Sequence, residues 1–127
     1  MEAKDSAKIL VVEDDFALSD AFSMILSHSG YDVSSVHHGK EALEYLEKNQ
    51  PDMILLDILM PVMGGREFLR NFTNTGKIPI VALSNLDSKA DIEEVISLGA
   101  QKYMLKSSVT PASLATLVEE TLRDARS

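Results

Sequence analysis

The sequence of 127 residues contains no cysteine, and this absence excludes a disulfide scaffold, a thiolate zinc site and a thiol nucleophile. Positive charge is also scarce, because 12 lysine and arginine residues face 20 aspartate and glutamate residues, which gives a formal net charge of −8. A surface this acidic does not suit the phosphates of nucleic acids, so we expect no direct nucleic acid binding.

Long apolar runs are missing as well. The run at residues 53–56 is far shorter than the about 20 residues that a membrane-spanning helix needs. The first eight residues are charged and do not resemble a signal peptide. We therefore expect no membrane association and a cytoplasmic location.

The chain has the length of one domain, since single domains cluster at about 100 to 150 residues. With 45% hydrophobic and 25% charged residues, its composition is that of an ordinary globular protein. We predict a single domain over residues 1–127, with a folded core over about 7–125. The sequence leaves open whether this domain stands alone or is part of a longer protein.

Five short runs rich in Ile, Val and Leu have the character of β-strands, at residues 8–12, 32–36, 53–57, 80–83 and 102–105. Their starts lie between 21 and 27 residues apart, which leaves room for one helix after each strand. Strands that alternate with helices predict an α/β fold with a parallel sheet. The first, third and fourth runs are continuously apolar, so we expect these strands at the centre of the sheet.

Apolar residues recur at helical spacing between and after these runs. The first such pattern covers residues 18–26 and stops before Gly30, with Asp15 as the expected N-cap. The last begins with Thr110 as a candidate N-cap and Pro111 at the first helical position. Three further helices are predicted around residues 42–46, 68–72 and 92–96.

Two of these helices carry specific expectations. The helix around residues 68–72 should begin at Gly64 and Gly65 and end near Gly76. The helix around residues 92–96 should turn Val95 and Ile96 toward the core. The six methionines are expected to fill the core, and His28, His37 and His38 to lie on the surface.

Polar residues follow four of the predicted strands. Glu13 and Asp14 follow the first, Asp57 ends the third, Ser84 follows the fourth and Lys106 follows the fifth. The carboxyl ends of parallel strands meet at one edge of the sheet, where open α/β folds bind their ligands. We therefore expect these side chains to form one site.

Clustered carboxylates repel each other, and a proton or a cation relieves that repulsion. A hard divalent ion such as Mg²⁺ suits a few carboxylates whose shell is completed by water or phosphate oxygens. Lys106 can hold a phosphoryl oxygen, or pair with Asp57 when none is bound, and Ser84 can donate a hydrogen bond to a second oxygen. A carboxylate can also be the nucleophile in phosphoryl transfer.

Five motifs occur in order along the chain: Glu13-Asp14, Leu55-Leu56-Asp57-Ile58-Leu59-Met60-Pro61 with Met63-Gly64-Gly65, Ser84 after Pro79, Gly99-Ala100, and Tyr103 with Lys106. In this combination the sequence resembles the receiver domain of two-component response regulators, from Lys8 to about Arg123. The resemblance implies a flavodoxin-like doubly wound sheet with strand order 2-1-3-4-5 and five helices. It also implies a switch in signal transduction rather than a dedicated enzyme.

The resemblance assigns the acidic residues by position. Asp57 matches the phosphoacceptor, which takes a phosphoryl group from the phosphohistidine of a sensor histidine kinase or a histidine phosphotransfer protein. Mg²⁺, or Mn²⁺, would be bound by Asp14, Asp57 and the backbone carbonyl of Leu59, with Glu13 acting through water.

The remaining positions match the phosphoryl-binding and switching residues of the family. Lys106 corresponds to the lysine that binds the phosphoryl group, and Ser84 to the hydroxyl that moves toward it. Tyr103 matches the aromatic switch on the face formed by the fourth helix, the fifth strand and the fifth helix, where a downstream protein would bind.

Three residues depart from the family pattern. Ser107 stands where a proline after a cis peptide bond is usual, so the Lys106–Ser107 bond is either cis at a cost of about 3 kcal/mol or trans with Lys106 set differently. Asn85 stands where Ala or Gly is common, and Leu59 where polar residues are common. From Asn85 and Leu59 we predict a long-lived aspartyl phosphate.

Other functions fit these residues less well. A haloacid-dehalogenase-type phosphatase needs a second aspartate two residues after the first, but Leu59 occupies that position. The glycine-lysine loop of a P-loop enzyme is missing, and a flavodoxin-type cofactor site does not explain the acidic residues. The remaining alternative is a degenerate receiver that binds a partner constitutively.

Overall fold

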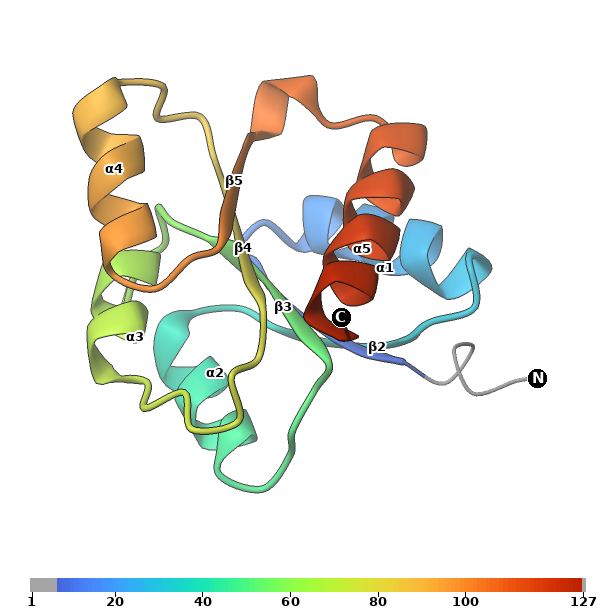
Figure 1. Cartoon of the computed structure of the whole chain (residues 1–127), viewed down its shortest axis with the longest axis horizontal. Helices are drawn as coiled ribbons and strands as arrows, with labels where there is room; N and C mark the ends of the chain where they lie inside the picture. Colours follow the sequence, from blue (N-terminus) through green and yellow to red (C-terminus); the bar gives the residue numbers. More distant parts are fainter. Residues whose placement is uncertain (1–6, 127) are drawn as a thin grey trace.

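Five parallel strands form one sheet in the order β2-β1-β3-β4-β5 (Figure 1). The computed structural model describes residues 7–126. The strands are β1 (Lys8–Val12), β2 (Asp32–Val36), β3 (Met53–Asp57), β4 (Ile80–Ser84) and β5 (Lys102–Leu105). The α/β fold and the strand order expected from the resemblance are confirmed.

The three central strands, β1, β3 and β4, are the most buried. Every residue of β3 and β4 is buried, and so are four of the five residues of β1. The two edge strands, β2 and β5, are only partly buried. A strand covered on both faces needs apolar side chains at every position, which is why the continuously apolar runs lie in the middle of the sheet.

Five α-helices cover the two faces of the sheet: α1 (Phe16–His28), α2 (Gly39–Leu46), α3 (Gly65–Asn71), α4 (Lys89–Ser97) and α5 (Pro111–Arg126). Helices α1 and α5 lie on one face, and α2, α3 and α4 lie on the other (Figure 1). None of the helices within residues 7–126 is long and apolar enough to cross a membrane.

The alternation of side chains along each strand divides the core into two layers. Ile9 and Val11 of β1 pack with α1 and α5, whereas Leu10 and Val12 pack with the other three helices. Successive side chains of a strand point to opposite faces, so one apolar strand supplies both layers. The sheet is thereby held from both sides, and its carboxyl edge is a rigid support for polar groups.

Most helix ends lie where the sequence predicts them. Asp15 caps α1 by accepting the N–H of Leu18 at 3.1 Å, and Thr110 accepts the N–H of Ser113 at 3.0 Å before α5. Gly30 and Gly99 follow α1 and α4 with positive φ angles of 101° and 130°, a conformation that glycine adopts at little cost.

The expected end of α3 near Gly76 is wrong, because this helix ends at Asn71. The side chain of Asn74 accepts the N–H of Ile78 and donates to its carbonyl, both at 2.8 Å. An asparagine that satisfies backbone groups in this way competes with the helix and holds a loop instead.

The expected burial of Ile96 is also wrong. Ile96 is 40% exposed, whereas its neighbour Val95 is fully buried in the core. Adjacent helical residues are separated by about 100° around the axis, and in α4 this rotation turns Ile96 away from the layer that buries Val95.

Candidate functional site

The carboxyl edge of the sheet collects the polar residues that the sequence singles out. Asp57 is the last residue of β3 and pairs in register with Leu83, the residue before Ser84. Ser84 pairs with Leu105, the residue before Lys106. The parallel register therefore brings these three groups to adjacent strand ends, next to the segment that follows β1.

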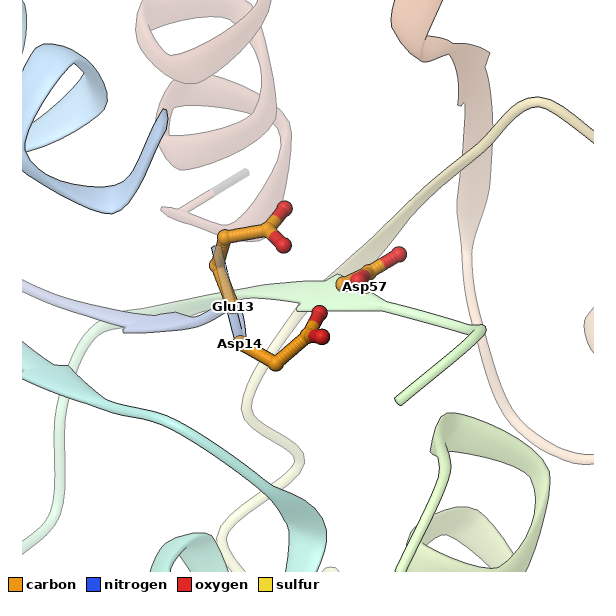
Figure 2. A group of neighbouring side chains, drawn as sticks. All are labelled: Glu13, Asp14 and Asp57. Atoms are coloured by element: carbon orange, nitrogen blue, oxygen red, sulfur yellow. The ribbon is translucent and has the colours of Figure 1, made fainter. Parts of the chain in front are cut away.

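Three carboxylates gather at this edge, from Glu13, Asp14 and Asp57 (Figure 2). One carboxylate oxygen of each lies within 4.8 Å of the other two. Glu13 and Asp57 are almost fully buried, and Asp14 is half-buried. Such closely spaced oxygen ligands form the kind of set that binds a hard divalent cation.

One ammonium group lies among these carboxylates. Lys106 Nζ is 2.8 Å from Glu13 Oε1 and 3.1 Å from Asp57 Oδ1. The second oxygen of Asp57, Oδ2, is buried and has no hydrogen-bond partner among residues 7–126. Within the described part of the chain, three carboxylates against one ammonium leave the cluster short of positive charge, and a buried polar atom without a partner is costly.

The titration of the two central groups reflects this imbalance. Burial, assisted by the nearby charge of Glu13, raises the pKa of Asp57 from 3.8 to about 7, although Lys106 works in the opposite direction. Burial by itself lowers the pKa of Lys106, but its hydrogen bonds and charge interactions with Glu13 and Asp57 outweigh burial and raise it. The lysine is therefore charged at neutral pH, while Asp57 is close to its own midpoint.

Ser84 is buried at the end of β4, and its Oγ accepts the N–H of Leu86 at 3.2 Å. A hydroxyl that accepts one hydrogen bond still has its own O–H to donate. The carbonyl of Leu86 in turn accepts the hydroxyl of Tyr103 at 2.7 Å. Leu86 thus connects Ser84 with Tyr103, a link that the sequence does not predict.

The Lys106–Ser107 peptide bond is trans, which decides between the two possibilities that the sequence leaves open. Lys106 begins the short 3-10 helix η2 (Lys106–Ser108), and its side chain still reaches Asp57. The N–H of Ser107 donates to Asn85 Oδ1 at 3.1 Å. The loops after β4 and β5 are therefore joined beside the site.

The loop after β3 folds closely over the end of that strand. The N–H of Gly65 donates to the carbonyl of Ile58 at 2.9 Å. A Cβ atom on Gly65 would come within 2.8 Å of the Asp57 carbonyl oxygen, so this approach requires glycine. Leu59 lies in this loop with its side chain 55% exposed.

Of the three histidines, His28 lies on the surface as expected, but His37 and His38 are half-buried. His37 Nδ1 lies 3.0 Å from the carbonyl oxygen of Glu13, and its ring contacts that of Phe16 at a centroid distance of 4.1 Å. His38 Nδ1 accepts the N–H of Glu41 and caps α2. The contact with Glu13 spans 24 residues of sequence, and no local pattern indicates it.

Comparison with known proteins agrees with this geometry. The family model of the response regulator receiver domain matches residues 9–119. Response regulator MprA of Mycobacterium ulcerans (strain Agy99) is 36% identical over 113 residues, which cover 88% of this chain and 49% of that protein. MprA of Mycobacterium avium (strain 104) is 35% identical over 111 residues, or 87% and 49%. The chain spans about half the length of these curated relatives.

Solved structures with the same fold include two receiver proteins. The signal receiver domain of a signal transduction histidine kinase from Syntrophus aciditrophicus has 30% identity and a TM-score of 0.84, covering 94% of this chain and 92% of that one. The chemotaxis response regulator CheY4 of Vibrio cholerae has 29% identity and a TM-score of 0.84, covering 91% and 98%.

The buried charge of Asp57 makes stability depend on pH. Because folding raises the pKa of Asp57 from 3.8 to about 7, the contribution of this group to the stability of the wild type falls as the pH rises from about 4 to about 7. Asp57→Asn carries no charge, so we expect it to be more stable by about 2 kcal/mol at pH 8 and to have no advantage at pH 4.

Urea denaturation at pH 4, 6 and 8 measures this difference. Asp87→Asn is the control, because Asp87 is an exposed carboxylate outside the cluster. An Asp57→Asn protein that is no more stable than the wild type at pH 8 would contradict the prediction.

Proposed function

Because this chain belongs to the response regulator receiver domain family of two-component signalling, we propose that it is a phosphorylation-controlled switch in which Asp57 accepts a phosphoryl group. The observation that carries this proposal is the state of the Asp57 carboxylate. One oxygen is held by Lys106, and the other is buried without a partner among the described residues. That second oxygen belongs to a buried carboxylate and can attack phosphorus without first giving up a hydrogen bond to a described residue.

The proposed donor is the phosphohistidine of a sensor histidine kinase or a histidine phosphotransfer protein. An Asp57 oxygen forms a bond to phosphorus while the phosphorus–nitrogen bond of the donor breaks. The leaving imidazole nitrogen keeps the electron pair and takes up a proton. Membership in the receiver domain family supports a phosphohistidine as the donor.

The acidic cluster fits a divalent cation. Asp14 and Asp57 would bind Mg²⁺ or Mn²⁺ directly together with the backbone carbonyl of Leu59, and Glu13 would act through water. The fit rests on three carboxylate oxygens within 4.8 Å and on the shortage of positive charge around them. When bound, the cation neutralises the carboxylates and the incoming phosphoryl oxygens.

Lys106 and Ser84 are the proposed phosphoryl-binding groups. Lys106 already contacts Asp57 Oδ1, so a phosphoryl group on Asp57 would lie within reach of the same ammonium. The Ser84 hydroxyl lies one strand away and has an O–H to donate. In these roles Lys106 neutralises negative charge on the phosphoryl group, and Ser84 donates a hydrogen bond to one of its oxygens.

We further propose that Ser84 passes this change to the face formed by α4, β5 and α5, where a downstream protein would bind. Ser84 Oγ accepts the N–H of Leu86, and the hydroxyl of Tyr103 donates to the carbonyl of the same residue. A Ser84 hydroxyl that turns toward a phosphoryl oxygen loosens its hold on Leu86, and the contact with Tyr103 shifts with it.

The domain is a signalling module rather than a dedicated enzyme, since its chemistry is its own phosphorylation. The alternative is a degenerate receiver that binds its partner constitutively. That alternative predicts no phosphorylation of Asp57, so a single experiment separates the two.

Acetyl phosphate with Mg²⁺ is expected to add one phosphoryl group to the wild type, detected by intact-mass spectrometry. Asp57→Asn and samples with a chelator should show no adduct, because the nucleophile or the cation is missing. Asp15→Asn is the matched control, since asparagine also caps helices and Asp15 is not a proposed ligand. If neither acetyl phosphate nor a phosphohistidine donor modified the wild type, the degenerate receiver would be the better explanation.

The aspartyl phosphate is expected to be long-lived, because the apolar Leu59 offers no polar group to an attacking water and Asn85 narrows the access of water to the site. Leu59→Asn and Asn85→Ala should each shorten its lifetime by about tenfold, or about 1.4 kcal/mol in activation free energy. Loss of the adduct after removal of the donor measures the lifetime. Val62→Asn, in the same loop and 74% exposed, is the control; equal lifetimes in all four proteins would argue against this role.

The switch is tested by comparing amide chemical shifts before and after phosphorylation. In the wild type we expect changes at Leu86, in the loop after β4, and at residues of α4 and β5, Tyr103 among them. Ser84→Ala should still be phosphorylated but should lose most of these changes, because the link to Leu86 is gone. Ser97→Ala, at the exposed end of α4, should behave like the wild type. Full shift changes in Ser84→Ala would refute the proposed path.

A further inference from the structure

The two chain segments that carry the proposed phosphoryl-binding groups, Ser84 and Lys106, are joined by the side chain of Asn85. The backbone ladder between β4 and β5 ends with the pair Ser84 and Leu105. Beyond that pair, Asn85 Oδ1 accepts the N–H of Ser107 at 3.1 Å. The asparagine side chain thus extends the connection between the two chain segments past the end of the sheet.

This contact requires the two residue types that stand there. A proline at position 107 has no N–H to donate, and an alanine or glycine at position 85 has no side-chain acceptor. Asn85 and Ser107 are both departures from the receiver pattern described above. The structure joins these two residues in one hydrogen bond, in which Ser107 supplies the N–H donor and Asn85 supplies the acceptor oxygen.

Both residues of this contact are neighbours in sequence of a proposed site residue. Asn85 directly follows Ser84, and Ser107 directly follows Lys106, whose Nζ lies 3.1 Å from Asp57 Oδ1. The Lys106 carbonyl also accepts the N–H of Val109 at 3.2 Å, which closes the short helix η2. The backbone that carries the lysine is therefore held at Ser107 by Asn85 and at its carbonyl by Val109.

We propose that Asn85 is a positioning residue for phosphoryl transfer: by holding the Ser107 N–H, it fixes the backbone from which Lys106 reaches Asp57. This inference rests on the proposed function of Asp57 and Lys106. It assigns to the Asn85–Ser107 pair the restraint that keeps a long, flexible side chain directed at the phosphoacceptor. Small displacements of a group that binds the reacting atoms have large effects on rate.

The decisive variant is Asn85→Leu, which keeps the size of the side chain and removes the acceptor. If Asn85 positions Lys106, the rate of phosphorylation by acetyl phosphate should fall by about tenfold. If Asn85 acts only by its bulk at the entrance, the rate should not change. Ser107→Ala is the matched control, since it removes the hydroxyl but keeps the N–H, and should phosphorylate like the wild type.

A double-mutant cycle with Lys106→Ala tests whether Asn85 acts through the lysine. Asn85→Leu should have no further effect on the phosphorylation rate in the Lys106→Ala background, because there is no ammonium left to position. The same tenfold loss in both backgrounds would overturn the inference, since Asn85 would then act independently of Lys106.

Amide hydrogen exchange at Ser107 reports the contact without any phosphorylation. We expect the Ser107 N–H to exchange faster in Asn85→Leu than in the wild type, whereas the N–H of Leu18, at the distant cap of α1, should be unchanged. Equal exchange at Ser107 would overturn the inference by itself. A wild type that is never phosphorylated would overturn the proposed function instead, and the exchange result would still decide on the contact.

Discussion

The shortage of positive charge at the carboxyl edge of the sheet is the constraint on which the site depends. Asp57 ends β3, and Glu13 and Asp14 directly follow β1, so the packing of these adjacent strands on both faces of the sheet places the three carboxylates close together. One ammonium, that of Lys106, lies among them. Burial magnifies the imbalance, because buried charges are poorly screened by water. A protein does not stabilise itself with such a cluster, and its existence points to a ligand.

The same imbalance explains how the site can be both stable and reactive. Asp57 relieves part of the cost by titrating near neutral pH, and Lys106 relieves another part by pairing with it. A bound cation could replace the proton on Asp57, and a phosphoryl group could replace Asp57 as the partner of Lys106. The groups that stabilise the resting cluster are thus the groups proposed to bind the phosphorylated one, so the proposed phosphorylation would exchange the partners of these groups in a site that already exists.

The proposed transmission away from the site would depend on two residues of the loop after β4, Asn85 and Leu86. Leu86 is held by Ser84 through its N–H and by Tyr103 through its carbonyl. The side chain of Asn85 instead accepts the backbone N–H of Ser107, the residue after Lys106. One short loop therefore contacts both the proposed output residue and the proposed phosphate-binding residue. In the proposed switch, a change at Ser84 would reach Leu86 and Tyr103 through these hydrogen bonds to backbone groups.

The sequence by itself determined the features that depend on near neighbours or on regular repetition. The apolar runs predicted the central strands, Asp15 and Thr110 predicted helix caps, and the polar residues after each strand predicted the site, because parallel strands end at one edge. Only the tertiary structure decided the contacts between distant segments, namely His37 with Glu13, Tyr103 with Leu86 and Ser107 with Asn85, which span 24, 17 and 22 residues. Such contacts follow from how the loops pack against one another, and no periodicity in the chain records that packing.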